Sequence, residues 1–182
     1  MTKDIERKIA VIFVTDVVGF SKMMEKNEDE TLRSFRSCRD ILDNLFKEHG
    51  GRIFNTAGDS VLAEFQSAVS AVICAKEFQN LVRERNANVE EDAVMHFRIG
   101  LNMGDVIVEG ENLYGEGVNV AARLEALSQP DGVSLSKSIL DFVNKKTELD
   151  FHDLGEQKVK NTTVHAFDLA DPDLEVRTLE TS

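Results

Sequence analysis

The chain has few of the features that mark disordered, secreted or membrane-spanning proteins. Its 182 residues include 2 Pro, and hydrophobic periodicity continues almost throughout, so wholesale disorder is excluded. The longest apolar run, residues 9–14, has strand length and falls far short of the roughly 20 residues that cross a bilayer. Residues 1–8 are mixed in charge and no small-residue cleavage site follows them, which is unlike a secretory signal. We therefore expect a cytoplasmic protein without membrane insertion.

Cysteine, histidine and basic residues are also scarce. Cys38 and Cys74 both fall in helix-periodic stretches, which predicts reduced core residues rather than a disulfide framework. The 4 histidines are scattered and make no zinc-binding pattern. The 21 Lys and Arg stand against 33 Asp and Glu, a net charge of −12, which argues against a nucleic-acid partner. A single nucleotide is still compatible, because bound Mg²⁺ and one or two basic side chains can meet its charge.

The hydrophobic pattern predicts one domain over residues 1–170 and a polar tail or linker over 171–182. Hairpins mixed with helical crossovers predict an α+β fold, with helices packed on a mixed or antiparallel sheet as in the ferredoxin-like sandwich. The expected strands cover about 8–14, 52–56, 60–65, 95–103, 105–109, 133–135, 149–154, 157–160 and 164–169. The expected helices cover about 25–49, 68–86 and 118–128, and a fourth runs from a Ser136 cap to about 146. Gly50 is expected to end the first helix, and Ser67 to cap the second. Residues 86–92 and 111–117 are expected to be loops.

Two carboxylates occur where the fold does not need them. Asp16 ends an apolar strand, and Asp59 lies at the tip of the following hairpin. The helix between them is a crossover that returns the chain beside the first strand, so the two side chains can face each other. Unpaired carboxylates about 4 Å apart repel by roughly 4 kcal/mol at an effective dielectric near 20, so such a pair needs a cation such as Mg²⁺. Taken separately, Asp59 also fits a turn residue and Asp16 a residue that opens a loop.

Two further segments suit the binding of phosphate. Gly19, followed by Phe20 between strand and helix, lets the backbone approach an anion, although no P-loop or dinucleotide motif accompanies it. Asn119 and Arg123 are four residues apart on a predicted helix and share a face. An amide and a guanidinium pointing the same way suit the charge that spreads over oxygens during phosphoryl transfer. A solvated helix face is the alternative interpretation of this pair.

Five motifs, in this order and spacing, resemble those of the class III nucleotidyl cyclases, the adenylyl and guanylyl cyclase catalytic domains. The resemblance covers about residues 8–169. The motifs are FVTDVVGFS at 13–21, TAGDS at 56–60, FRIG at 97–100, YGEGVNVAARLE at 114–125 and LGEQKVKN at 154–161.

The resemblance implies a role for most of the candidate residues. Asp16 and Asp59 would hold two Mg²⁺ or Mn²⁺ ions, with the Val17 carbonyl as an extra ligand. Asn119 and Arg123 would stabilise the transition state. The residues that would contact the phosphates of the nucleotide are Lys160 and Arg98. The family works as a head-to-tail dimer, so a homodimer of this chain would have two composite sites, each with aspartates from one chain and Asn, Arg and Lys from the other.

The sequence departs from the family pattern at the two positions that read the base. Adenylyl members typically place Lys four residues before the second metal-binding Asp, and Asp seven before the transition-state Asn; guanylyl members place Glu and Cys there. The matching positions here hold Asn55 and Asn112. Because an amide offers both a donor and an acceptor, we expect weak base discrimination, with ATP favoured and GTP as the second candidate.

The primary hypothesis is an enzyme that converts ATP to 3′,5′-cyclic AMP and pyrophosphate by a two-metal mechanism in a signalling role. The alternative is a catalytically weak or silent cyclase-like module that binds nucleotide for regulation. The retained metal-binding and transition-state residues favour the enzyme. The two asparagines at the base-reading positions favour the module.

Overall fold

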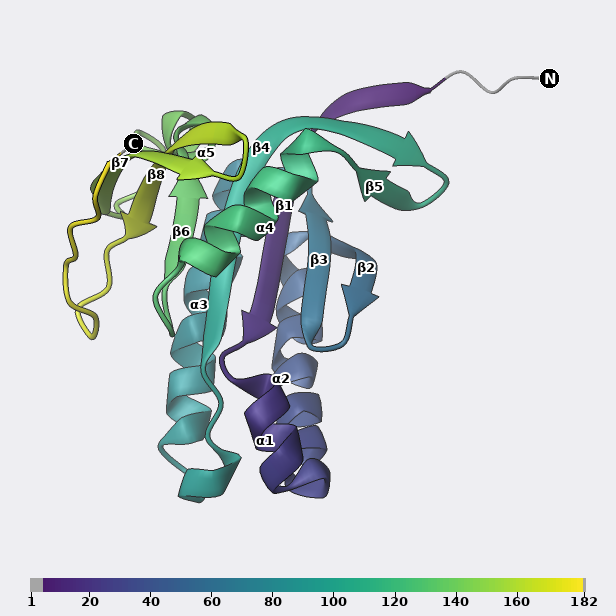
Figure 1. Cartoon of the computed structure of the whole chain (residues 1–182), viewed down its shortest axis with the longest axis vertical. Helices are drawn as coiled ribbons and strands as arrows, with labels where there is room; N and C mark the ends of the chain where they lie inside the picture. Colours follow the sequence, from purple (N-terminus) through teal and green to yellow (C-terminus); the bar gives the residue numbers. More distant parts are fainter. Residues whose placement is uncertain (1–4, 182) are drawn as a thin grey trace.

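A mixed β-sheet forms the middle layer of the structure (Figure 1). The computed structural model describes residues 5–181. The strands are β1 (Glu6–Val17), β2 (Gly51–Ala57), β3 (Ser60–Phe65), β4 (Phe97–Glu109), β5 (Asn112–Tyr114), β6 (Val133–Ser136), β7 (Phe151–Val159) and β8 (Thr162–Leu169). Their order across the sheet is β2-β3-β1-β4-β6-β8-β7, and β5 pairs with β4. Neighbouring strands are antiparallel except β4 and β6, which are parallel.

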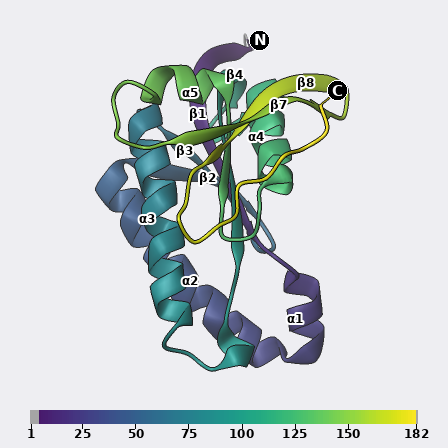
Figure 2. The ribbon, with the colours of Figure 1, turned by 90° about the vertical axis from the view of Figure 1, so that its left-hand side faces the viewer.

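Helices cover both faces of this sheet (Figure 2). They are α1 (Phe20–Lys26), α2 (Glu28–His49), α3 (Ala68–Asn86), α4 (Glu116–Leu127) and α5 (Lys137–Val143). The apolar faces of α2, α3 and α5 share one core with the sheet, whereas α4 packs on the opposite face. This arrangement confirms the predicted α+β fold with a mixed sheet. Within residues 5–181, no helix is both long enough and apolar enough to cross a lipid bilayer.

Strand β1 is apolar from Ala10 to Val14 because both of its faces are buried there. Val11 and Phe13 point into the core beneath α2 and α3. Ile12 and Val14 point to the other face, toward α4. Successive side chains of a strand alternate between faces, so a central strand between two helical layers needs an unbroken apolar run. That run ends at Val14, two residues before Asp16, at the edge of the sheet where the candidate site lies.

The predicted helix ends of α2 and α3 are confirmed. Gly50 adopts a left-handed conformation with φ 78° after the last turn of α2. The Ser67 hydroxyl accepts a hydrogen bond from the Ser70 amide at the start of α3. The predicted core cysteines are confirmed as well: Cys38 and Cys74 are free and buried, and burial raises the pKa of their thiols to about 11 and about 12, respectively.

Several elements differ from the sequence-based expectation. The helix expected from about residue 25 is preceded by a separate short helix, α1, because Asn27 adopts an extended conformation and its side chain caps α2. The two strands expected on either side of Gly104 form one strand, since Gly104 pairs with Ala10 in the regular ladder of β1. Residues 112–114 of the expected 111–117 loop form β5, and the two segments expected near 149–160 form β7, with a register shift at residues 153–155.

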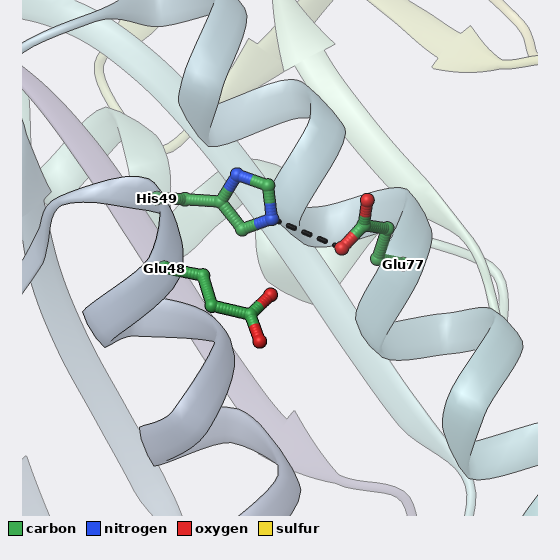
Figure 3. A group of neighbouring side chains, drawn as sticks. All are labelled: Glu48, His49 and Glu77. Atoms are coloured by element: carbon green, nitrogen blue, oxygen red, sulfur yellow. Dashed lines mark hydrogen bonds and ion pairs between the residues drawn. The ribbon is translucent and has the colours of Figure 1, made fainter.

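A hydrogen bond between side chains joins α2 to α3 on the outer side of the helical layer (Figure 3). His49 Nε2 lies 2.9 Å from Glu77 Oε2. The Glu48 carboxylate points toward the same place, and the ligand-type atoms of all three residues lie within 4.8 Å of one another. This polar contact lies on the helical layer made by α2 and α3, and α4 packs on the opposite face of the sheet.

The segment after β8 has no regular secondary structure and is largely exposed, but individual residues of it contact the sheet. Arg177 donates to Asp168 on β8 at 2.7 and 2.9 Å. The Gln157 side chain donates to the Glu180 carbonyl at 3.0 Å. Of the expected domain and tail, residues 1–4 and residue 182 lie outside the described part of the chain.

Replacing Gly100 with Ala should destabilise the protein by about 3 kcal/mol, the upper part of the usual cost of overpacking. A Cβ at this position would overlap the backbone of Ala121 and Glu125 in α4, which cannot move aside as a flexible side chain could. Urea unfolding monitored by circular dichroism measures the change. The matched control is Gly104→Ala in the same strand, where the nearest atom to the new Cβ is the Asn102 amide nitrogen at 3.3 Å. Equal losses in the two variants would contradict the importance of the contact between α4 and β4.

Candidate active site

The two candidate metal-binding aspartates lie at one edge of the sheet. Asp16 is near the end of β1, and Asp59 is in the turn between β2 and β3. The antiparallel pairing of β1 with β3, in which Thr15 lies opposite Val61, carries this turn back to the end of β1. The Val17 amide donates a hydrogen bond to Asp59 Oδ2 at 2.9 Å. Asp59 is therefore fixed beside the residue that follows Asp16.

Arg98 is the cationic partner of Asp16. The two residues are opposite each other in the ladder between β1 and β4. The guanidinium lies 3.3–3.4 Å from the Asp16 carboxylate oxygens, and the Asp16 side chain is 20% exposed. On its other side Arg98 faces α4: its Nε is 3.7 Å from Glu125 Oε2, and its Nη1 is 3.5 Å from the Ala126 carbonyl.

Glu125 adds a third carboxyl group to this edge. It is 5% exposed and lies on the face of α4 that packs against Gly100 of β4. Burial raises the pKa of Glu125 to about 9, and the hydrogen bond and negative charge of Asp16 act in the same direction, while Arg98 opposes them. In the chain without ions, the protonated form of Glu125 is therefore favoured near neutral pH.

Gly19 and Phe20 connect β1 to α1 next to this acidic edge. Gly19 has φ 68°, a left-handed conformation, and precedes the first turn of α1. The Val18 amide is already engaged by the His96 carbonyl at 2.8 Å. The Phe20 ring packs edge-on against Phe35 of α2 at 5.6 Å. Phe20 thus anchors the turn in the core, and only its backbone and that of Gly19 remain as candidate phosphate contacts.

Three other candidate side chains gather in a separate cleft of about 400 Å³. It lies between α4 and the turn that joins β7 to β8. Asn119 and Arg123 line it from α4, and Lys160 lines it from the turn, where its backbone has φ 56°. Glu116 supplies an acidic group at the same cleft. Neither Asp16 nor Asp59 belongs to its lining.

The geometry of α4 explains why one chain has two separate groups of candidate residues. Residues two apart on an α-helix point about 200° apart around its axis. Glu125 therefore faces the sheet and the aspartates, whereas Arg123 faces the cleft with Lys160. Within residues 5–181 the structure brings together Asp16, Val17, Asp59 and Arg98 as one group, and Asn119, Arg123 and Lys160 as another.

Asn55 and Asn112, at the two base-reading positions, lie on β2 and β5. A hydrogen bond of 2.7 Å from Arg52 to the Glu111 carbonyl links the two segments. The Asn55 side-chain oxygen accepts from the Thr56 amide at 2.9 Å. Asn112 is engaged at both ends of its amide, by the Leu113 backbone and by the Tyr114 hydroxyl. The amide oxygens of both side chains therefore already have local partners.

Residues 2–170 match the family described as "Adenylate and Guanylate cyclase catalytic domain". The chain belongs to this family. A putative adenylate cyclase 3 of Rhizobium meliloti is 42% identical over 160 residues, which are 87% of this chain and 27% of that protein. An adenylate cyclase of Streptomyces coelicolor is 29% identical over 130 residues, 71% of this chain and 32% of the other. The chain thus spans about a third or less of the length of these two curated relatives.

Solved structures of cyclase domains have the same fold. The crystal structure of an adenylate/guanylate cyclase/hydrolase from Silicibacter pomeroyi superposes with a TM-score of 0.84 at 34% identity, covering 92% of this chain and 99% of that one. The adenylyl cyclase CyaB from P. aeruginosa superposes with a TM-score of 0.79 at 20% identity, covering 95% of this chain and 100% of the other. The second comparison supports the fold alone.

The acidic edge of this cyclase domain has the chemistry of a divalent-cation site. Its candidate donors are carboxylate and carbonyl oxygens, which Mg²⁺ prefers. Asp16 and Asp59 outnumber the guanidinium of Arg98 there, so negative charge is in excess even while Glu125 is protonated. The residues present therefore fit the ions that cyclases generally use.

Glu125 is the site residue that the sequence analysis did not assign, although it ends the longest of the five motifs. Ala121 and Leu124 are completely buried on the inner face of α4, and Glu125 lies on that same face. A charged residue within the apolar stripe of a helix is the signal that could have identified it.

The stability of the metal-free domain should fall as the pH rises from about 5 to about 9. The pKa of Glu125 is raised from 4.5 to about 9 by folding, so in this range the folded chain keeps a proton that the unfolded chain has released. The contribution is complete below the unfolded pKa and is lost as the pH rises through the folded one. Urea unfolding midpoints between pH 5 and 9 measure the slope.

The slope should be shallower in Glu125→Gln, whose amide does not titrate. Glu64→Gln is the matched control, since Glu64 is also 5% exposed and ion-paired, with Lys8 and Arg52. Hydrogen bonds from Lys8 and Arg52 outweigh burial and lower the pKa of Glu64, so its contribution changes only at acid pH. Identical slopes in the wild type and Glu125→Gln would contradict the prediction.

Proposed function

We propose that the domain converts ATP to 3′,5′-cyclic AMP and pyrophosphate at composite sites between two copies of the chain. The observation that carries this proposal is the cleft in which Asn119, Arg123 and Lys160 meet, apart from the two aspartates. Each group alone offers half of what phosphoryl transfer needs. A second copy, placed head to tail, would set the acidic edge of one chain against the cleft of the other.

The acidic edge positions the reacting groups of the nucleotide. Asp16, Asp59 and the Val17 carbonyl would hold two Mg²⁺ or Mn²⁺ ions. Ions bound there would lower the pKa of the ribose 3′-hydroxyl and neutralise the charge of the departing pyrophosphate. Arg98 and the backbone around Gly19 and Phe20 contact the phosphates from the same side. No side chain at this edge is needed as a separate general base, because the substrate's own phosphate or a hydroxide can take the proton.

The cleft of the other chain stabilises the charge that develops at the α-phosphorus. Arg123 donates from its guanidinium and Asn119 from its amide to the oxygens of the transition state, while Lys160 neutralises the triphosphate. Holding these donors on the packed helix α4 keeps them aligned before the reaction, which removes most of the entropic cost of alignment. The nucleophile attacks the phosphorus in line with the leaving group.

An exposed apolar surface supports the assembly of two copies. The first half of β1, the end of β4 and β5 form an arm that extends beyond the rest of the sheet (Figure 1). Its exposed apolar side chains include Ile9 on β1 and Tyr114 on β5, with exposed fractions of 63% and 45%. Large exposed apolar side chains grouped on one element are typical of protein interfaces.

The base is read weakly in this proposal. The Asn55 oxygen accepts from Thr56, and the Asn112 amide is engaged by Leu113 and Tyr114, so neither side chain is held ready to pair with one particular purine. ATP is the proposed main substrate and GTP the second. We place the reaction in the cytoplasm, which keeps thiols such as Cys38 and Cys74 reduced, and assign the cyclic product a signalling role.

The same two asparagines favour one other function, a cyclase-like module that binds nucleotide without turning it over. The charged Lys–Asp pair that is typical of adenylyl cyclases at these two positions is absent here. Such a module would bind ATP with divalent ions and release no cyclic product, so a product assay separates the two functions.

Purified protein incubated with ATP or GTP and Mg²⁺ or Mn²⁺ should form the cyclic nucleotide. In the same assay, the Arg123→Ala variant should turn over roughly 10²–10³-fold more slowly than the wild type. Nucleotide affinity should change little, because Arg123 acts on charge that develops in the transition state. Chromatography of the products gives turnover, and calorimetry with 3′-deoxy-ATP, which cannot cyclise, gives affinity. Arg33→Ala, which removes an exposed arginine paired within α2, is the control. Equal losses of binding and turnover would count against the assigned role.

Mixing Asp59→Ala chains with Arg123→Ala chains should restore part of the activity that each variant lacks. A mixed dimer has one site with both the intact acidic edge and the intact cleft, whereas its other site carries both substitutions. Random pairing makes half of the dimers mixed, so the mixture should reach up to about a quarter of the wild-type rate. Sedimentation confirms that both variants still dimerise. Dimeric variants that fail to complement would refute the shared site.

A further inference from the structure

The end of α2 and the middle of α3 bring three side chains with metal-binding chemistry together (Figure 3). Glu48 and His49 are the last two residues of α2, and Glu77 lies on α3. His49 Nε2 is 2.9 Å from Glu77 Oε2, and one ligand atom of each side chain lies within 4.8 Å of the other two. The group belongs to the helical layer of α2 and α3, whereas α4 packs on the opposite face of the sheet.

The backbone that carries these three side chains is held by the core. Phe46, in the same last turn of α2, is buried. On α3, Cys74 and Phe78 lie on either side of the glutamate in sequence, and both are completely buried. All of these buried residues belong to one hydrophobic cluster, so the two helices cannot separate without breaking it. The polar side chains therefore need only rotate, without any movement of their helices, to close on an ion.

Negative charge is in excess where the two helices meet. Burial raises the pKa of the Cys74 thiol to about 12, and the charges of Glu77 and Glu48 act in the same direction. The last carbonyls of α2 add partial negative charge, as at any helix C-terminus. Lys76, which precedes Glu77, lines a different cleft together with residues 148–150. A cation beside His49 would therefore meet favourable charge from both helices.

The ligand types select the class of ion. One imidazole nitrogen and two carboxylate oxygens suit Zn²⁺, whereas Mg²⁺ prefers oxygen ligands in octahedral geometry. A tetrahedral zinc ion with bonds of about 2.0–2.2 Å keeps its donor atoms roughly 3.4 Å apart. That separation lies between the 2.9 Å of the His49–Glu77 contact and the 4.8 Å that bounds the whole group. Three protein ligands leave the fourth position of such an ion to water.

Two other histidines show what distinguishes this group. His165 also lies beside two carboxylates, but it meets them through different ring nitrogens. Its Nε2 is 2.7 Å from Asp153, and its Nδ1 is 3.7 Å from Glu156. Because the two nitrogens lie on different sides of the ring, one ion cannot bind the ring and both carboxylates. His96 is ion-paired with one carboxylate, that of Asp131.

We propose that Glu48, His49 and Glu77 form a zinc site that links α2 to α3. The His49 Nε2 atom gives up the proton that it donates to Glu77, either to Nδ1 or to water, and its lone pair then binds the ion. The spacing of histidines along the sequence could not indicate this site, because Glu77 is 28 positions from His49 and meets it through helix packing. The ion stabilises the helical layer, so the inference does not depend on the proposed function.

The test titrates Zn²⁺ alone into the full chain carrying Asp16→Asn and Asp59→Asn. These substitutions remove the carboxylates of the acidic edge, which could otherwise bind the added ion, and keep the size of both side chains. Calorimetry should show one zinc ion per chain. Zinc at a 100-fold excess over its dissociation constant should raise the melting temperature by roughly 5–10 °C. No binding in this background, or one ion per two chains, would overturn the proposal.

Variants of the three ligands test the assignment in the same background. Glu77→Gln keeps an oxygen that accepts from His49 but is a poor zinc ligand. This variant and His49→Ala should each weaken zinc binding by about 100-fold or more, since even an outer partner of a metal ligand is worth 10–100-fold. Glu48→Gln should weaken it by about 10-fold, because this side chain is exposed and costs more to order. The matched control is His165→Ala, which also removes a histidine beside two carboxylates and should leave the affinity unchanged. Unchanged affinity in Glu77→Gln, or an equal loss in His165→Ala, would contradict the site.

Nuclear magnetic resonance of the imidazole rings gives a readout that needs no substitution among the ligands, so it holds even where a variant fails to fold. In the same background, Zn²⁺ should shift the ring signals of His49 and leave those of His96 and His165 in place. Shifts confined to His96 or His165 would place the ion elsewhere and refute the assignment.

Discussion

Helix α4 lies so close to β4 that its backbone fills the space where a side chain of residue 100 would be. This contact sets the position of every candidate residue on the helix. The inner side of α4 is held against the sheet, so Glu125 is directed at Asp16 and Arg98. The outer side of α4 bears Asn119 and Arg123, which line the cleft together with Lys160. A glycine at one strand position thereby determines how the charged groups of two separate regions are oriented.

The acidic edge is organised at the expense of stability. Two carboxyl groups, those of Asp16 and Glu125, share the Arg98 guanidinium, and burial favours the protonated form of the second. A group with a strongly shifted pKa, such as Glu125, beside other charged groups is typical of sites that bind or transform charged ligands. The His49–Glu77 contact between α2 and α3 is different, because in the chain without ions it pairs one acceptor with one donor.

The fold class and most elements could be predicted from the sequence because their signals are local. The apolar run of β1, the Ser67 cap and the stop at Gly50 each reflect contacts within a few residues. The separation of α1 from α2 was missed because it depends on the extended backbone of Asn27, which helix periodicity does not reveal. Continuity of β4 through Gly104 was missed because pairing with the distant strand β1 decides it.

The candidate site was predictable to the extent that its residues carry recognisable chemistry at fixed spacings. Asp16, Asp59, Asn119 and Arg123 could be selected in this way, but not their division between an edge and a cleft, which follows from the direction of each side chain around α4. The apolar stripe of α4 marks Glu125 as unusual, but its contacts could not be predicted, since its partners Asp16 and Arg98 are 109 and 27 positions away along the chain and meet it only through the packing of α4 on β4. The engagement of Asn55 and Asn112 by neighbouring backbone groups likewise depends on the local course of β2 and β5.

The docked segment after β8 affects where the chain can be shortened. Asp168 is 7% exposed, and Arg177 is the cation that contacts it. A protein trimmed at the end of β8 would keep this carboxylate in its enclosed position and lose the counter-ion, which is a more damaging change than losing both together. The smallest unit that satisfies its own interior charges therefore extends at least to residue 177, although the last strand of the sheet has already ended at Leu169.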